Sequence, residues 1–175
     1  MNVLLEDMPE EYEGYKIDSS FQTGILISMC MSDDELNEQD KALVDLAKQA
    51  TANSYSPYSH FRVGAAIRLS DDSTIIGANQ ENAAFGVTLC AERSAIFAAQ
   101  AQQPGKAILA IAIAARTENG FTKQPISPCG SCRQVMVEIE KRYQQPLHIV
   151  LYGENAIYVI ESIKNLMPLS FENLD

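Results

Sequence analysis

Two short cysteine-containing blocks constrain this chain more than any other feature of its sequence. The first block, Leu89 to Phe97, contains Cys90, and the second, Pro128 to Gln134, contains Cys129 and Cys132. Together they hold three of the four cysteines of the chain. Each block opens a segment with helical spacing of apolar residues, which predicts a helix N-terminus at each block. If the three thiols bind one metal ion, the two helices must lie on the same face of the fold.

The residue types in these blocks predict a zinc site. Zinc prefers thiolate and imidazole ligands, and a catalytic zinc site keeps three protein ligands and one open position. Cys129 and Cys132 are three residues apart, so the first turn of a helix can direct both thiols to one ion. Thiolates are also stabilised at a helix N-terminus. The only histidines, His60 and His148, lie outside both blocks, so no fourth ligand is apparent and the open set favours catalysis.

Charged residues next to the cysteines complete the predicted chemistry. Glu92 follows Cys90 by two positions, where a carboxylate can carry protons to and from a water that zinc activates. Three thiolates on one dication leave about one net negative charge. Arg93 and Arg133 lie beside the ligands, and we expect them to offset this charge by donating hydrogen bonds to sulfur.

Both blocks resemble the zinc signature of the cytidine deaminases, in which a glutamate that is not a ligand accompanies the metal-binding cysteines. The matching residues are Cys90-Ala91-Glu92-Arg93 and Pro128-Cys129-Gly130-Ser131-Cys132-Arg133-Gln134. A cysteine as the first ligand resembles the nucleoside deaminases, whereas the polynucleotide and deoxycytidylate deaminases typically have His-x-Glu. Three further segments also resemble family segments: Tyr58 to Ala66, Gly77 to Phe85 and Leu166 to Phe171.

The resemblance implies a role for individual residues. It implies Zn²⁺ as the cofactor, with Cys90, Cys129 and Cys132 as ligands and Glu92 as the catalytic acid and base. The implied substrate contacts are Phe61 against the base, Asn79 and Glu81 at the ribose hydroxyls, the Ala91 carbonyl at the exocyclic amine, and Phe171 stacking on the base, often in another subunit. Without the resemblance, Asn79 and Glu81 would be interpreted as loop-ordering residues, and Phe61 and Phe171 as core residues.

The order of the remaining segments predicts an α/β fold. The pattern predicts helices over 32–53, 89–103, 129–143 and 162–167, strands over 61–69, 74–79, 107–115, 147–152 and 156–160, and a loop over 117–127. This order gives one mixed sheet of about five strands, and the resemblance implies a three-layer α-β-α arrangement.

We expect an N-terminal extension over residues 1–33 and a catalytic domain over 34–175. The apolar stretch from Phe21 to Met31 is interpreted as an extra edge strand, an arm on a neighbouring subunit, or a partly disordered segment. Cys30 lies in this stretch, and we expect it to be a small buried hydrophobe rather than a metal or redox group.

Composition excludes several classes of partner. The chain has 13 basic and 23 acidic residues and a net charge of −10, which argues against a nucleic acid polymer as the ligand. An uncharged nucleoside remains compatible with this charge. The first residues are acidic rather than basic, and no apolar run has the length of a membrane span. We therefore expect a cytoplasmic protein whose cysteines bind metal rather than form disulfides.

The predicted reaction is the hydrolytic deamination of cytidine and deoxycytidine in pyrimidine salvage, and the resemblance implies a homotetramer with shared active sites. One alternative is a deaminase of another cytosine-containing small molecule, such as a blasticidin-type nucleoside. A second alternative is a zinc-stabilised interaction module without activity. Phe85 stands where the family often has Tyr, and Arg62 where Pro is common, which bears on specificity and subunit contacts.

Overall fold

The computed structural model describes residues 11–12, 15–16 and 26–172. Near the N-terminus, β1 (Glu11–Tyr12) pairs antiparallel with β2 (Tyr15–Lys16). Residues 1–10, 13–14 and 17–25 of the predicted extension, which include the first part of the apolar stretch that begins at Phe21, lie outside the described residues. The division of the chain at residue 33 stays a prediction.

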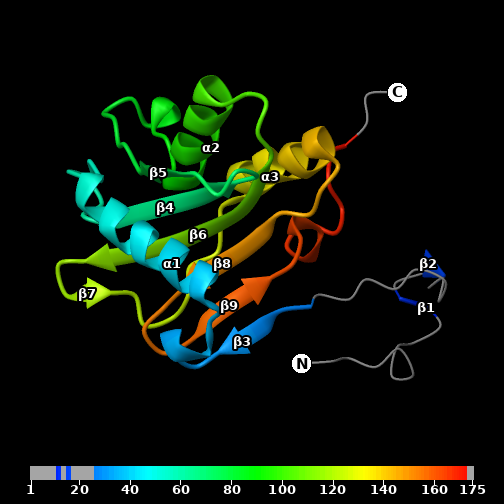
Figure 1. Ribbon diagram of the computed structural model, residues 1–175, viewed down its shortest axis with the longest axis horizontal. Helices are drawn as coiled ribbons and strands as arrows, with labels where there is room; N and C mark the ends of the chain where they lie inside the picture. Colours follow the sequence, from blue (N-terminus) through cyan, green and yellow to red (C-terminus); the bar gives the residue numbers. More distant parts are fainter. Residues whose placement is uncertain (1–10, 13–14, 17–25, 173–175) are drawn as a thin grey trace.

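A mixed sheet of seven strands forms the centre of the described part of the chain (Figure 1). Its order is β3-β9-β8-β6-β4-β5, with β7 paired to β6. The strands are β3 (Ser28–Cys30), β4 (Arg62–Leu69), β5 (Thr74–Ala78), β6 (Ile108–Thr117), β7 (Gly120–Phe121), β8 (His148–Tyr152) and β9 (Ile157–Ile160). The pair β6–β8 is parallel, and the other neighbouring pairs are antiparallel.

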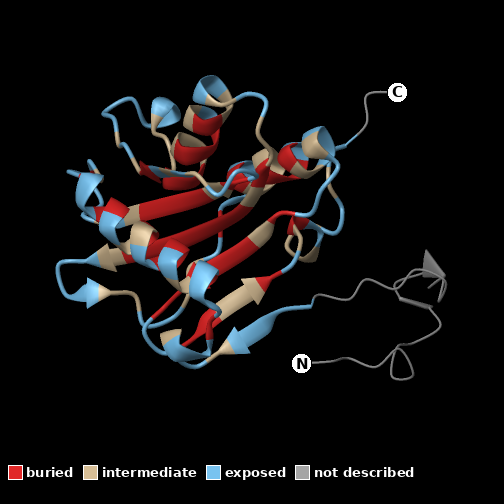
Figure 2. Ribbon diagram, viewed as in Figure 1, coloured by how far each residue is buried: buried red, intermediate tan, exposed pale blue. Residues whose placement is uncertain are grey.

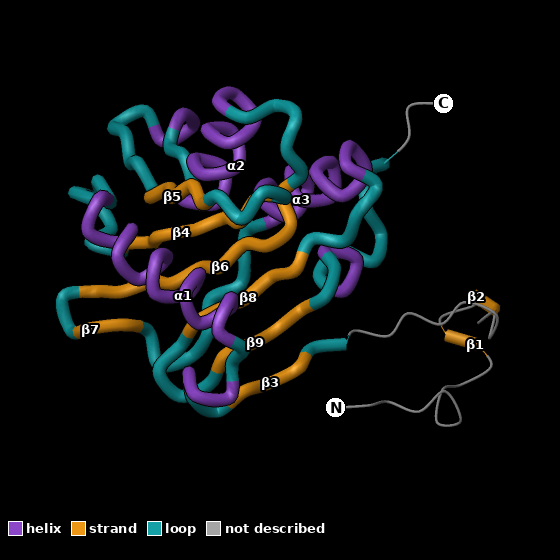
Figure 3. Tube along the Cα trace, in the orientation of Figure 1, coloured by secondary structure: helices purple, strands orange, loops and turns teal. Residues whose placement is uncertain are grey.

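Helices cover both faces of this sheet. Successive side chains of a strand point to opposite faces, and β4 follows that rule. Ala65 and Ile67 pack in one apolar cluster with α2 (Ala91–Gln102) and α3 (Gly130–Tyr143). Ala66 packs in a second cluster with α1 (Glu38–Ala50). The three-layer α-β-α prediction is thus confirmed, and both cysteine-bearing helices lie on the same face of the sheet. Figure 2 shows that the central strands are buried, and Figure 3 shows the arrangement of helices and strands.

Two glycines allow the main chain of a helix to lie in direct contact with the main chain of a strand. A Cβ at Gly77 of β5 would lie 2.6 Å from the carbonyl oxygen of Ala91, at the start of α2. A Cβ at Gly64 of β4 would lie 2.6 Å from the main-chain nitrogen of Thr51, at the end of α1. Such distances leave no room for a side chain, so glycine at position 77 sets how close the first metal helix lies to the sheet.

The sheet is wider than the five strands expected, because two short strands extend it. Five of the seven strands match the prediction. β3 adds an edge strand by pairing antiparallel with β9, which is the first of the three interpretations made for this part of the extension. β7 lies within the predicted loop 117–127 and pairs with β6. Gly120 has a φ of 109°, and an Asn-Gly pair between extended segments is itself a hairpin signal.

The first helix begins later than predicted. Ser32 makes no capping hydrogen bond, and residues Asp33–Glu35 form a separate 3₁₀ turn. Asn37 instead caps α1, since its Oδ1 accepts from the Asp40 amide at 2.8 Å and its Nδ2 donates to the Asp40 carboxylate at 2.8 Å. An Asn–Asp pair that satisfies both main-chain and side-chain groups provides the stronger helix start.

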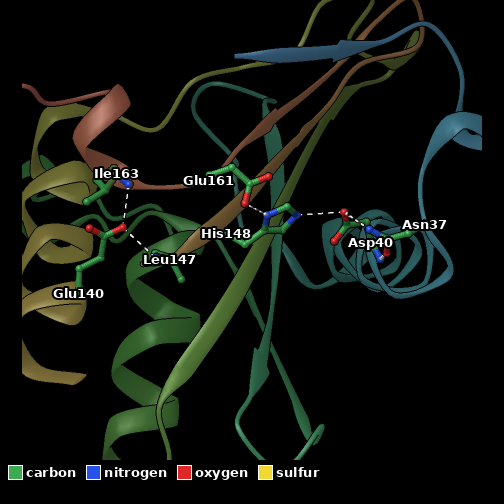
Figure 4. A network of polar contacts seen from close by, with 7 residues as sticks. All are labelled: Asn37, Asp40, Glu140, Leu147, His148, Glu161 and Ile163. Atoms are coloured by element: carbon green, nitrogen blue, oxygen red, sulfur yellow. Dashed lines mark hydrogen bonds and ion pairs between the residues drawn. The ribbon is translucent and has the colours of Figure 1, made fainter. Parts of the chain in front are cut away.

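The fourth cysteine and the two histidines each have a structural role in the fold. Cys30 is half-buried and packs against the α1-side cluster, as a hydrophobe would. His60 closes a tight turn with a φ of 55°. His148 of β8 contacts Asp40 through Nε2 at 2.9 Å and Glu161 through Nδ1 at 3.3 Å (Figure 4).

Candidate metal centre and active site

Three thiols meet where the N-termini of α2 and α3 converge. Cys90 is the N-cap residue of α2, Cys129 is the N-cap residue of α3, and Cys132 lies in the first turn of α3. The Sγ atom of Cys129 lies 3.8 Å from that of Cys90 and 3.5 Å from that of Cys132. All three sulfurs lie within 4.8 Å of one another. Neither N-cap side chain makes a capping hydrogen bond, so both thiols are available to a ligand.

These distances fit a single zinc ion. A tetrahedral zinc with Zn–S bonds of about 2.3 Å places its sulfurs roughly 3.8 Å apart. Among the described residues, no fourth histidine, cysteine or carboxylate belongs to this cluster. The donor set among the described residues is therefore one of three thiols, which fits the predicted zinc cofactor.

The thiols differ in acidity before any metal binds. Hydrogen bonding from Cys132 lowers the pKa of Cys90 to about 5, and the Arg93 guanidinium acts in the same direction against the opposing effect of burial. The pKa of Cys132 is raised by the same hydrogen bond and by burial. Binding of a metal ion displaces such thiol protons.

Glu92 is a buried carboxylate beside the cluster. It is the second residue of α2, and only 5% of its surface is exposed. Burial raises the pKa of Glu92, and the negative charge of Cys90 adds to that increase. A buried carboxyl group that faces metal-binding thiols has the environment that an acid/base group requires.

The two arginines of the cysteine blocks have different partners. The Nη2 atom of Arg93 donates to Cys90 Sγ at 3.7 Å, as expected for a residue that offsets thiolate charge. Arg133 does not reach a sulfur, so that part of the prediction was wrong. Its guanidinium donates instead to the main-chain carbonyls of Pro128, just before the N-cap of α3, and of Leu166, each at 2.8 Å.

Asn79 joins the end of β5 to the start of β4. Its Nδ2 donates to the Phe61 carbonyl at 2.9 Å, and its Oδ1 accepts from the Val63 amide at 2.8 Å. The Ser54 hydroxyl also donates to Oδ1, at 2.5 Å. Asn79 thus orders the loop that carries Phe61, whose side chain is half-buried. Ser54 had no sequence signal for this role, since 25 positions separate it from Asn79.

Glu81 is held by the turn before β4. Its carboxylate accepts from the amides of Tyr58 and Ser59 at 2.9 and 3.2 Å and from the Ser59 hydroxyl. The hydroxyl bond is the main reason that the pKa of Glu81 is lowered. The Tyr58-Ser59 pair therefore fixes an ionised carboxylate, and the Ser-rich turn at 54–59 is the sequence feature that marks these partners.

The two remaining residues predicted to contact the substrate, Ala91 and Phe171, differ in how far they are buried. Ala91 is fully buried in the first turn of α2, directly between Cys90 and Glu92. Phe171 is 67% exposed, so it does not dock on the core of its own chain. Its carbonyl accepts from Gln134 Nε2 of α3 at 2.7 Å, which fixes the main chain and leaves the ring free.

A three-layer α-β-α fold with an open three-cysteine site and a buried glutamate defines a zinc-dependent deaminase. Residues 37–144 match the family described as the cytidine and deoxycytidylate deaminase zinc-binding region. The chain belongs to this family.

Individual relatives agree with that assignment. The chain is 48% identical over 97 residues to a cytidine deaminase of Halalkalibacterium halodurans, an alignment that covers 55% of this chain and 69% of the relative. The solved structure of cytidine deaminase from Burkholderia pseudomallei matches with a TM-score of 0.64 and 40% identity, covering 74% of this chain and 97% of that one. A blasticidin-S deaminase of Bacillus cereus is more distant, at 30% identity over 138 residues, or 78% of this chain and 94% of the relative.

Proposed function

We propose that this protein catalyses the zinc-dependent hydrolytic deamination of cytidine and deoxycytidine to the corresponding uridine nucleosides and ammonia. The observation that carries the proposal is the cluster of three thiols with a buried Glu92 beside it and no fourth ligand among the described residues. When bound, zinc supplies a Lewis acid that lowers the pKa of a water at its open position. A structural zinc would have a closed ligand set.

Glu92 carries the protons of the reaction. It takes a proton from the attacking water and delivers one to the ring nitrogen N3, which makes carbon 4 electrophilic. The water oxygen bonds to carbon 4, and Glu92 then takes the second proton from this oxygen and delivers it to the amine. The carbon–nitrogen bond breaks, ammonia leaves, and the oxygen becomes the carbonyl of the product. General acid/base transfer of this kind contributes roughly 10²- to 10⁴-fold in rate. The Ala91 carbonyl, adjacent to Glu92, accepts a hydrogen bond from the exocyclic amine and orients it.

The ribose and base are held by the loops that flank β4 and β5. Asn79 and Glu81 contact the ribose hydroxyls, and Phe61 packs against the base. The support for this part is the rigidity of the loops: both side chains are fixed by several hydrogen bonds to the 54–63 segment. A pre-ordered carboxylate and amide lose little entropy when they bind hydroxyl groups.

Phe171 completes the site by stacking on the base of a neighbouring subunit within a homotetramer. Its exposed ring on a fixed main chain supports this proposal. Other exposed apolar residues lie near the site in sequence, namely Phe85, Val87 and Phe97, which are 73, 66 and 44% exposed. Exposed apolar surface of this kind is typical of protein interfaces.

The biological setting that we propose is pyrimidine salvage in the cytoplasm. All four cysteines are free thiols in the structure, which suits a reducing compartment. No described helix has the length and apolar character needed to cross a membrane.

A spectrophotometric assay with zinc-loaded protein tests the proposal. The substrates are cytidine, deoxycytidine, cytosine, deoxycytidylate and blasticidin S, each with and without a chelator. We expect turnover of the two nucleosides and its loss on chelation. Preferential turnover of blasticidin S would support the alternative raised by the more distant relative. Zinc binding without turnover of any substrate would support an interaction module.

A further inference from the structure

Arg133 holds the main chain on both sides of a metal ligand. Its amide donates to the Cys129 carbonyl at 2.9 Å, and its Nε donates to the Pro128 carbonyl at 2.8 Å. These two carbonyls flank the Cα of Cys129, so a single residue fixes the main chain from which that thiol projects. Polar groups around metal ligands typically set ligand orientation in this way.

The other arm of Arg133 reaches a distant part of the chain. Nη1 donates to the Leu166 carbonyl at 2.8 Å, across 33 positions of sequence. Leu166 follows the 3₁₀ turn η5 (Ile163–Asn165) and packs against the α2/α3-side cluster. The segment 166–172 that begins there bears the exposed Leu169 and Phe171.

The start of η5 is anchored without Arg133. Glu140 Oε1 accepts from the amides of Leu147 at 2.8 Å and Ile163 at 2.9 Å (Figure 4). The Ser162 hydroxyl donates to Glu140 Oε2 at 3.0 Å. Loss of Arg133 therefore removes the side-chain bond to the Leu166 carbonyl, while Ile163 stays bound to Glu140 of α3.

We propose that Arg133 is a positioning residue that couples the metal ligand Cys129 to the C-terminal segment 166–172. No described ion pair involves Arg133, and the partners of its guanidinium are the two carbonyls. The planar guanidinium carries several donors in fixed directions and can bind both carbonyls at once, which a lysine ammonium on a flexible stem does not reproduce. The proposal rests on the zinc site and is independent of the proposed substrate.

The coupling must act in both directions, because coupling free energies between sites are reciprocal. A zinc ion that fixes Cys129 stabilises the bond from Arg133 to Leu166. An ordered Leu166 in turn raises the affinity of the site for zinc. The amides of Leu166 and Met167 report on this segment, since both donate to the Ile163 carbonyl, at 2.8 and 2.9 Å.

Hydrogen–deuterium exchange on the full-length protein tests the first direction. In the wild type, we expect removal of zinc by a chelator to accelerate exchange at Leu166 and Met167. In Arg133→Gln, exchange there should already be fast with zinc bound and should not change on chelation. The matched control is Gln134→Ala, which removes the bond to the Phe171 carbonyl but keeps the Arg133 contacts; it should retain the wild-type response to chelation.

Transfer of zinc to a chromophoric chelator tests the second direction. Loss of a group that orients a metal ligand typically weakens metal binding about 10- to 100-fold, and we expect Arg133→Gln to fall in that range. Arg133→Lys should recover part of the affinity at most, and Gln134→Ala should bind zinc with the wild-type affinity.

The wild-type exchange comparison decides the proposal even if Arg133→Gln does not fold. Unchanged exchange at Leu166 and Met167 after chelation would overturn it, as would equal zinc affinity of Arg133→Gln and Gln134→Ala. Cytidine turnover is a separate readout: a protein that turns over no cytidine but shows the coupled exchange would contradict the proposed function and leave this inference standing.

Discussion

The Sγ atoms of Cys90 and Cys129 lie 3.8 Å apart although 39 positions separate the two residues in the chain. This approach requires α2 and α3 to lie on the same face of the sheet with their N-termini together. Strand β6 connects the two helices through the centre of the sheet, and Gly77 lets the start of α2 rest against β5. The metal centre is thus a consequence of the packing of two helices, and perturbing that packing should perturb the metal.

Replacement of Gly77 by alanine should therefore destabilise the protein. The new Cβ would collide with the Ala91 carbonyl, and strain of this kind costs about 1–3 kcal/mol. We expect a lower urea midpoint and, because α2 must shift, weaker retention of zinc. Gly105→Ala is the matched control, since nothing lies within 4 Å of its Cβ position. Equal stability of the two variants would show that α2 is not held by this contact.

The His148–Asp40 contact should make stability depend on pH. The hydrogen bond to Asp40 is the main cause that raises the pKa of His148 above its ordinary value of 6.5, and Glu161 adds to it. A pKa raised in the folded state means that the folded protein binds more protons. The contribution of His148 is therefore complete below about pH 6.5 and is lost as the pH rises through the folded-state pKa.

Urea unfolding of the wild type and His148→Gln between pH 5.5 and 9 measures this effect. The stability difference between the two proteins should be largest at the acid end and should shrink toward the alkaline end. Asp40→Asn removes the partner carboxylate and should flatten the same profile. A difference that is constant with pH would mean that His148 does not gain a proton on folding.

Arg93→Gln should weaken zinc binding. Its guanidinium donates to Cys90 Sγ at 3.7 Å and offsets the negative charge of a three-thiolate zinc site. We expect zinc affinity, measured by competition with a chelator, to fall by about 10-fold or more. Arg93→Lys keeps the charge and should lie between the two. Wild-type zinc content and an unchanged pH–rate profile in Arg93→Gln would refute the charge-offset role.

Phe171→Ala should weaken substrate binding, and subunit mixing should reveal whose site the ring serves. Stacking of an aromatic ring on a base is worth roughly 1–3 kcal/mol, so KM for cytidine should rise about tenfold. Mixed oligomers of Phe171→Ala and Glu92→Gln subunits should regain activity, because some sites then combine an intact Glu92 with an intact Phe171. No recovery would indicate that Phe171 serves the site of its own chain.

The cluster of three cysteines could be predicted from the sequence because its signal is local. A Cys-x-x-Cys pair and a Cys-x-Glu pair each lie within one helical turn, and turn residues precede both. The pattern of apolar residues likewise predicted five of the seven strands, and the resemblance to the family implied the α-β-α layers. These features depend on helix and strand periods that can be read from a short window.

The features that the sequence did not reveal depend on contacts between distant segments. Ser54 lies 25 positions from Asn79, and Arg133 lies 33 positions from Leu166. An arginine beside two thiols is equally able to bind sulfur or a carbonyl, and the fold decides between them by bringing Leu166 to α3. The late start of α1, with Asn37 as its N-cap, also depended on competition between two capping sites, Ser32 and Asn37.

The central claim is that Glu92 moves protons beside a zinc ion that three cysteines hold. Its most direct test compares zinc-loaded wild type with Glu92→Gln, measuring zinc content and kcat for cytidine on the same preparations. We predict one zinc per chain in both proteins, with kcat reduced by roughly 10²- to 10⁴-fold in the variant. A Glu92→Gln protein that keeps wild-type kcat would contradict the claim.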